Sequence, residues 1–167
     1  MQVIKKMSTN SLTIKEPGLN VLPPGVERYN VTGGGITGIQ ILPEDEIEII
    51  NNEGNQICEI SIFNKEGKSD LSILNLKEIK KESEIKKILL KKNENSLTAL
   101  YQLKKRNLDI DKAKSSRVFD KDTNWGEKVK LKSKDKCYCI FAAPGSEMLI
   151  HEQNPPTDLT IFVKRAK

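Results

Sequence analysis

The amino-acid sequence predicts a mainly β fold, a β-barrel or β-sandwich, that carries a helical hairpin as an insertion. Short β-rich runs recur at a spacing of roughly ten residues, which is typical of barrels and sandwiches. One central segment, residues 77–107, instead has the Lys-, Glu- and Leu-rich composition of helices. A chain of 167 residues has the length of one domain. We therefore expect an N-terminal arm over residues 1–30 and one β-rich domain over residues 31–167.

Regular structure is expected to begin after the arm, which Pro-Gly and Pro-Pro-Gly sequences interrupt. Apolar and polar residues then alternate with the period of two that a half-buried strand shows, most clearly over residues 46–50 and 57–63. The Asn- and Gly-containing residues 51–55 between these runs favour a turn. The strands expected in this half of the chain are residues 36–42, 46–50, 57–63 and 71–76.

Two helices are expected within residues 77–107, divided by the polar residues 93–96. Asn95 or Ser96 is the expected N-cap of the second helix, because such side chains accept hydrogen bonds from the free N–H groups of a first turn. Apolar residues three or four positions apart mark the face expected to be buried. They are Ile85, Ile88 and Leu89 in the first helix, and Leu97, Leu100 and Tyr101 in the second.

The β-rich pattern returns after a polar link over residues 109–116. Turn residues at 134–135, 144–145 and 154–156 divide the runs from one another. The strands expected in this half are residues 128–131, 137–142, 148–150 and 159–163.

The positive charge of the chain is concentrated in the hairpin. The formal net charge is +5, from 28 basic and 23 acidic residues. Residues 77–107 hold ten of the basic and four of the acidic residues, so this segment carries +6 and the rest carries −1. Aromatic residues are 5% of the chain, too few to serve base stacking well. We therefore expect no nucleic-acid partner, and interpret the hairpin as either a solvated face or a surface for an acidic partner.

The sequence favours a cytoplasmic protein with no membrane segment. The first residues lack the uninterrupted apolar run of a signal peptide, and no stretch approaches the length that spans a bilayer. Three cysteines, an odd number, argue against a disulfide framework. The single histidine, His151, restricts catalysis, because His-rich metal centres need several imidazoles.

The cysteines and the histidine are the candidate metal ligands. Cys137 and Cys139 lie on one face of an expected strand, because side chains alternate along β-structure. With Cys58 and His151 they make a zinc set by residue type, although zinc sites more often use Cys-x-x-Cys turns. The competing interpretation is that the thiols pack as small hydrophobic groups. A cysteine nucleophile would instead need Cys58 or Cys139 beside His151, with Asp158 as the orienting group.

A glycine-rich segment, residues 33–38, matches the Gly-x-Gly-x-x-Gly pattern of dinucleotide sites. Such a site needs a helix to open at the last glycine, so that its N-terminus meets the pyrophosphate. Here a β-like run ended by Pro43 follows. The context favours a turn in which the backbone needs positive φ or a close approach.

Two stretches carry a family resemblance. Residues 54–64 contain a Gly-x-Gln turn, the acidic Glu59 and Phe63-Asn64, and in this they resemble the urea-carboxylase-associated family. Residues 117–161 contain Arg-Val-Phe-Asp, Ala-Ala-Pro-Gly and Pro-Pro-Thr-Asp sequences. They resemble the opening domain of larger proteins that fuse this module to a folate-binding, aminomethyltransferase-like region, such as trimethylamine-N-oxide demethylases.

The resemblance implies a β-rich subunit or module of a folate-linked one-carbon system, which demethylates methylamines or trimethylamine N-oxide. Catalytic members of the family hold zinc through cysteines in a segment with a His-Asp pair. This sequence has no His-Asp pair, and Glu59 replaces the usual Asp. We therefore expect assembly rather than chemistry, with no cofactor in this chain and tetrahydrofolate in the partner. The alternative is a stand-alone metal-dependent enzyme of the urea-carboxylase-associated type that uses Cys58, Cys137, Cys139 and His151.

The expected partner is an aminomethyltransferase-like catalytic protein or domain, and the chain is also a candidate for oligomerisation. Loops at the end of a β-scaffold commonly carry recognition. We expect the partner to contact residues 33–38 and the Pro144-Gly145 and Pro155-Pro156 turns.

Overall fold

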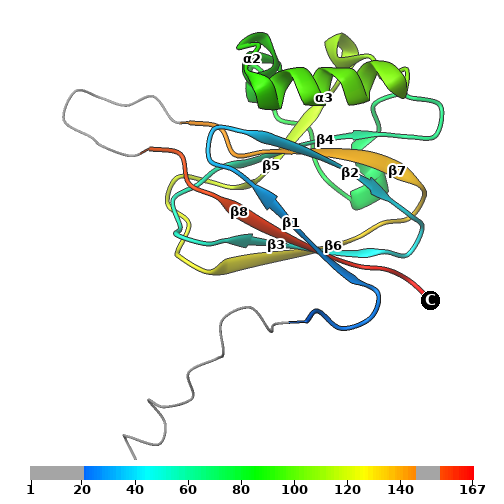
Figure 1. Cartoon of the computed structure of the whole chain (residues 1–167), viewed down its shortest axis with the longest axis vertical. Helices are drawn as coiled ribbons and strands as arrows, with labels where there is room; N and C mark the ends of the chain where they lie inside the picture. Colours follow the sequence, from blue (N-terminus) through cyan, green and yellow to red (C-terminus); the bar gives the residue numbers. More distant parts are fainter. Residues whose placement is uncertain (1–20, 146–154) are drawn as a thin grey trace, which may run out of the picture.

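The computed structural model describes residues 21–145 and 155–167, and in this part of the chain eight strands form two antiparallel sheets (Figure 1). The expected strand over residues 148–150 lies outside the described residues, as does His151. The first sheet has the order β1 (Val26–Val31), β8 (Leu159–Lys164), β3 (Glu46–Asn51), β6 (Glu127–Lys132). The second has the order β2 (Ile36–Ile41), β7 (Cys137–Ala142), β4 (Cys58–Phe63), β5 (Ser115–Phe119).

The two sheets pack face to face as a sandwich, so the mainly β prediction is confirmed. The four strands of each sheet form a separate ladder, and the barrel is not closed. Alternate residues of each strand point into the space between the sheets, as the period of two requires. Ile49 of β3, Ile60 of β4 and Ile161 of β8 are fully buried there and belong to one apolar cluster.

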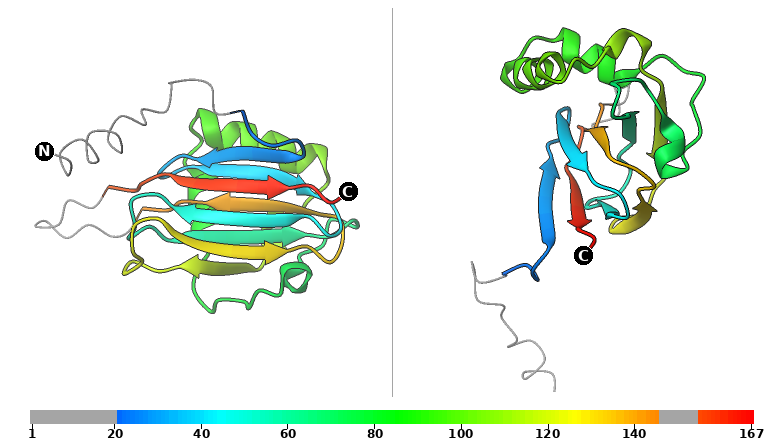
Figure 2. Two further views of the ribbon diagram at one scale, coloured as in Figure 1. Left: turned by 90° about the horizontal axis from the view of Figure 1, so that it is seen from below. Right: turned by 90° about the vertical axis from the view of Figure 1, so that its right-hand side faces the viewer.

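A helical layer covers the outer face of the second sheet (Figures 1 and 2). It consists of α2 (Glu84–Leu90) and α3 (Glu94–Lys105), which confirms the helical hairpin expected within residues 77–107. A second apolar cluster lies under these helices, where Ile85 and Leu89 of α2 meet Phe63 of β4 and Ile140 of β7. Strand β4 is consequently buried along its whole length on both faces, and the hairpin is part of the packed fold.

The expected buried face is correct for α2 and holds only at Leu100 in α3. Ile85, Ile88 and Leu89 are buried. In α3, Leu100 packs against the second apolar cluster and Ser96 and Leu103 are buried, whereas Leu97 and Tyr101 are exposed. The expected N-cap is also wrong, because α3 begins at Glu94 and the Asn93 side chain accepts from the N–H of Ser96. Asn95 instead accepts from the N–H of Ile36 in β2, at 2.9 Å.

A buried carboxylate joins the helical layer to the second sheet. Glu59 of β4 is fully buried and points toward the start of α2. Its carboxylate accepts from the hydroxyl of Ser83 at 2.9 Å and from the N–H of Glu84 at 3.0 Å. The first N–H groups of a helix lack partners within the helix, and the N-terminus favours a negative charge. Glu59 therefore stabilises the start of α2 from the sheet below.

Several expected boundaries differ from the structure. The strand expected over residues 71–76 is wrong, since the 3-10 helix η1 (Leu71–Leu74) occupies it, with Asp70 as N-cap. Leu71, Ile73 and Leu74 are buried in the cluster between the sheets, so their apolar character reflects packing. Strand β1 begins inside the range expected to be the arm. The range expected to be a polar link contains the 3-10 helix η2 (Ile110–Lys112) and the start of β5.

The edge strand β2 of the second sheet has hydrogen-bonding partners outside the sheet at both of its ends. The N–H of Ile36 donates to Asn95 from the helical layer. The carbonyl of Gln40 accepts from the guanidinium of Arg165, which follows β8, at 2.9 Å. Arg165 also forms ion pairs with Glu27 of β1 and Asp45, at 2.6 Å each, so it connects the two sheets along this side.

Candidate functional site

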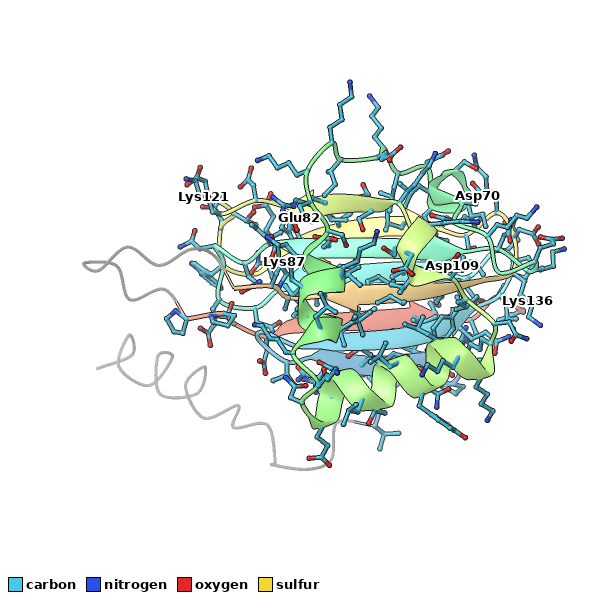
Figure 3. The ribbon with its side chains drawn as sticks, turned by 90° about the horizontal axis from the view of Figure 1, so that it is seen from above. Asp70, Glu82, Lys87, Asp109, Lys121 and Lys136 are labelled. Carbon is cyan, nitrogen blue, oxygen red and sulfur yellow. The ribbon has the colours of Figure 1, made fainter. Side chains whose placement is uncertain are left out.

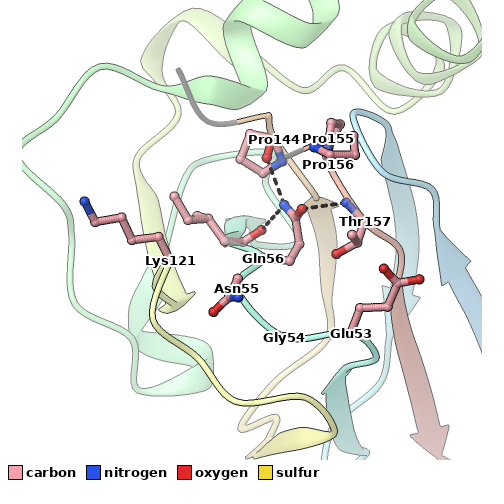
Figure 4. Close-up of a pocket in the computed structure, with 10 residues that line it drawn as sticks. Glu53, Gly54, Asn55, Gln56, Lys121, Pro144, Pro155, Pro156 and Thr157 are labelled. Carbon is pink, nitrogen blue, oxygen red and sulfur yellow. Dashed lines mark hydrogen bonds between the residues drawn. The ribbon is translucent and has the colours of Figure 1, made fainter. Parts of the chain in front are cut away.

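Four chain segments meet around Gln56 at one end of the sandwich (Figure 4). Gln56 lies in the turn between β3 and β4, and its side chain is almost fully buried. Its amide nitrogen donates to the carbonyls of Pro144 and Ile57, and its amide oxygen accepts from the N–H of Thr157, each at 2.8 Å. One side chain thus fixes the β3–β4 turn to the end of β7 and to the start of β8.

At this end of the sandwich, the backbone of another segment comes so close to two positions that only glycine fits there. A side chain at Gly33 would overlap the carbonyl of Pro156, and the N–H of Gly33 donates to the carboxylate of Asp158 at 2.8 Å. Gly54 has a φ of +79° and lies against the backbone of Trp125. The glycine-rich segment is therefore a turn that leads into strand β2, as its sequence context indicates, and no helix opens after it.

A cavity of about 230 Å³ lies beside Gln56, with Glu53, Lys121, Pro144, Pro156 and Thr157 among its lining residues (Figure 4). The hydroxyl oxygen of Thr157 is buried and has no hydrogen-bond partner among the residues that the structure describes. The rim carries one cation, Lys121, and one anion, Glu53, both exposed.

The only tryptophan of the chain lies next to this cavity. Trp125 is 81% exposed, and its backbone contacts Gly54. Exposed tryptophan side chains are characteristic of the residues that contribute most to protein interfaces. A rim that carries both charges, with an exposed tryptophan close by in the chain, can bind a small polar molecule or a partner's loop. The amide of Gln56 already makes hydrogen bonds to Ile57, Pro144 and Thr157, so it holds the surrounding segments in place.

The three cysteines are free thiols, buried in the space between the sheets. The sulfur atoms of Cys137 and Cys139 are 3.6 Å apart, so β7 brings these two together as the alternation predicts. Cys58 lies apart from them. Cys139 pairs with Ile62, and Cys58 is four residues before Ile62 on β4. That separation is about 13 Å along the strand.

The zinc set stays a prediction, because His151 lies outside the described residues. Within residues 21–145 and 155–167, no group of three or more His, Cys, Asp or Glu side chains is placed to hold a metal ion. Burial raises the pKa of the Cys58 thiol far above its ordinary value. The neighbouring Cys137 sulfur and burial together raise the pKa of Cys139. The described surroundings of both thiols therefore favour the neutral form, which is a poor nucleophile.

The turns expected to receive a partner are brought together by the structure. Gly33, Pro144 and Pro156 lie at the same end of the sandwich, around the Gln56 amide. The sequence patterns did not predict that Gln56 lies at the centre of this arrangement. They also did not predict that Trp125 is its exposed aromatic residue. A glutamine in a turn between two apolar strands, within the Gly-x-Gln motif, was the available signal for the first. Trp125 lies in an ordinary polar loop and gives no such signal.

Comparison with known proteins finds a similarity that extends over nearly the whole chain. The chain is 32% identical over 154 residues to the trimethylamine-oxide aldolase of Ruegeria pomeroyi. The match includes 92% of this chain but 19% of that protein, so the chain spans about a fifth of the length of its relative. No protein-family model matches the chain, and membership of the urea-carboxylase-associated family is not confirmed. Among the described helices, none is long and apolar enough to cross a membrane.

Proposed function

We propose that this chain is a β-sandwich module of a system that converts trimethylamine oxide, and that it contributes assembly rather than chemistry. The observation that carries the proposal is the alignment of nearly the whole chain with one part of the trimethylamine-oxide aldolase. A module that corresponds to a fifth of a larger enzyme has the size of a supporting domain. The Gln56 end, with its cavity and exposed Trp125, is the proposed wall of the partner's substrate channel.

The proposed partner is an aminomethyltransferase-like, folate-binding protein that supplies the remaining chemistry. Support for a partner comes from the chemistry of the described residues. The cavity beside Gln56 offers a hydroxyl and two exposed charges, while the cysteines point into the apolar space between the sheets. The one-carbon product would pass to tetrahydrofolate bound by the partner.

The test combines binding with turnover. The purified full chain is mixed with each purified aminomethyltransferase-like protein of the organism that encodes it. Complexes are detected by size-exclusion chromatography with light scattering, and consumption of trimethylamine oxide is measured with and without tetrahydrofolate. We expect the chain alone to be inactive, and one mixture both to form a complex and to consume trimethylamine oxide. Absence of any complex, or full activity of the chain alone, would contradict the proposal.

Metal analysis separates this function from that of a stand-alone enzyme. A metalloenzyme that used Cys58, Cys137, Cys139 and His151 would be purified with about one equivalent of zinc or iron and would need no partner. The assembly function predicts that chelation leaves complex formation unchanged. Loss of complex formation on chelation, with recovery on adding zinc, would favour a metal site.

A further inference from the structure

The helical layer exposes an apolar patch on its solvent side. Leu90, the last residue of α2, is 75% exposed, and Leu97 and Tyr101 of α3 are 54% and 63% exposed. Leu97 and Tyr101 are four residues apart, so they lie on one face of α3. The two helices are held together beside this patch, because the hydroxyl of Ser96 donates to the carbonyl of Ile88 at 2.7 Å. The exposed apolar residues therefore lie at the end of α2 and on the first turns of α3, which this hydrogen bond joins.

Positive charge predominates around this patch, although the exposed Glu94 lies one turn before Leu97. Lys91 and Lys92 follow Leu90, and Lys104 and Lys105 follow Tyr101 by three and four residues. These four lysines are exposed, and none forms an ion pair within the part of the chain that the structure describes. Lys87, by contrast, pairs with Glu82 and Glu84 on the side of α2 seen in Figure 3. The charges around the patch are thus left available for a partner.

The chemistry of the patch discriminates among partners. Two copies of the same cationic face would repel each other, so this face does not favour a symmetric dimer. Nucleic acid would use the lysines, but Tyr101 is the single ring that this patch offers for base stacking, beside the aliphatic Leu90 and Leu97. A protein surface uses both features, with apolar side chains at the centre and charges around them. Charge complementarity requires that surface to be acidic.

We propose that the exposed face of the helical layer, centred on Leu97 and Tyr101, docks onto an acidic surface of the catalytic partner. This inference rests on the proposed function, and it names the surface through which assembly occurs. The Gln56 end of the sandwich then stays free to face the partner's substrate. The two surfaces belong to different parts of the fold, so each can be altered without the other.

Paired substitutions test the docking face in the full chain. Leu97→Ser with Tyr101→Ser removes the apolar centre, and Lys104→Glu with Lys105→Glu reverses the adjacent charge. The dissociation constant for the purified aminomethyltransferase-like protein is measured by titration calorimetry at low and at high salt. We expect each pair to weaken binding by at least about tenfold. Binding of the unaltered chain should weaken as salt rises, and the lysine variant should lose most of that dependence.

The matched control is Lys136→Glu with Lys164→Glu, which makes the same charge change at two exposed lysines, one just before β7 and one at the end of β8. The control should bind within about twofold of the unaltered chain. Equal binding by all variants would overturn the docking face while leaving the proposed function supported. The docking face would also be overturned if the unaltered chain binds double-stranded DNA or anionic vesicles and both hairpin variants lose that binding.

A second readout applies if no aminomethyltransferase-like protein binds, an outcome that contradicts the proposed function. The photo-crosslinker p-benzoylphenylalanine is placed at Tyr101, and at Arg28 on β1 as the control, in the organism's own cells. The docking face would be supported if an acidic protein is crosslinked at position 101 and not at position 28. The same adduct should be lost when Lys104→Glu and Lys105→Glu are added to the crosslinking chain. Absence of a specific adduct would overturn it.

Discussion

Gln56 connects three chain segments through one amide, so its substitution tests the centre of the candidate site. In Gln56→Glu, a carboxylate oxygen replaces the nitrogen that donates to the carbonyls of Pro144 and Ile57. The free energy of unfolding should fall by about 2 to 3 kcal/mol, because buried acceptors lose their donor. Urea denaturation measures this change. Asn52→Asp, at an exposed site in the same turn, should change stability by less than about 0.5 kcal/mol.

The thiols make a second prediction at the scale of single residues. Cys58, Cys137 and Cys139 are at most 3% exposed, so burial shields all three from reagents. Burial also raises the pKa of Cys58, whereas the hydrogen bond with Cys139 lowers the pKa of Cys137. The native protein should therefore react with Ellman's reagent at least about a hundredfold more slowly than the protein unfolded in guanidinium. Three thiols per chain should react after unfolding. Rapid reaction of one thiol in the native protein would instead indicate an accessible thiolate.

Among the elements, α2 depends on a residue of the strand beneath it. Glu59→Ala removes the carboxylate that accepts from Ser83 and Glu84, and should lower the free energy of unfolding by about 2 to 4 kcal/mol. Hydrogen exchange should accelerate most in α2, while the first sheet stays protected. Glu82→Ala, which removes an exposed carboxylate before the same helix, is the control. Uniform acceleration throughout the chain would contradict a local role for Glu59.

The elements also show why sequence patterns succeed in some places and fail in others. In the half-buried strand β3, polar and apolar residues alternate from Glu46 to Ile49, so periodicity identified it. The residues of η1 are apolar because they fill space between the sheets, and a short apolar run does not distinguish that packing from a strand. In α3 the apolar Leu97 and Tyr101 occupy the solvent face, and periodicity assigns such residues to the core by default.

For the molecule as a whole, the pair formed by Asp45 and Arg165 predicts how stability depends on pH. Burial alone would raise the pKa of Asp45. The N–H groups of Ala166 and Leu42 and the Arg165 guanidinium outweigh burial and hold that pKa below its ordinary value. The carboxylate therefore stabilises the fold fully above the ordinary pKa of about 4, and the contribution is lost as pH falls through the lower native value.

The measurement for this prediction is urea denaturation as a function of pH. Below about pH 4, the free energy of unfolding should fall more steeply for the unaltered chain than for Asp45→Asn, which has no carboxylate to protonate. At neutral pH the variant should be the less stable of the two, because Arg165 keeps only Glu27 as an ion-pair partner. Parallel curves for the two proteins would show that Asp45 does not link folding to protons.

At the same scale, the sequence predicted the fold class and the hairpin, but the relation between separate segments had to come from the structure. Turns at 33–38, 144–145 and 155–156 were each identifiable from their glycines and prolines. Their meeting at Gln56 depends on the order of strands in two sheets, which local patterns do not specify. The excess charge was placed correctly in the hairpin, yet its exposed apolar centre was visible only once the helices were oriented.

The capped edge of β2 limits how this chain can associate. An open edge strand offers unpaired N–H and carbonyl groups to any passing strand, and so invites aggregation or domain swapping. Here Asn95 and Arg165 occupy the groups at Ile36 and Gln40, and the β6 edge of the other sheet carries Lys128, Lys130 and Lys132. Sheet extension is thereby disfavoured at these two edges, one in each sheet. A partner that approached along the β2 or β6 edge would have to displace these groups, so these two edges favour contacts through the faces and loops of the sandwich.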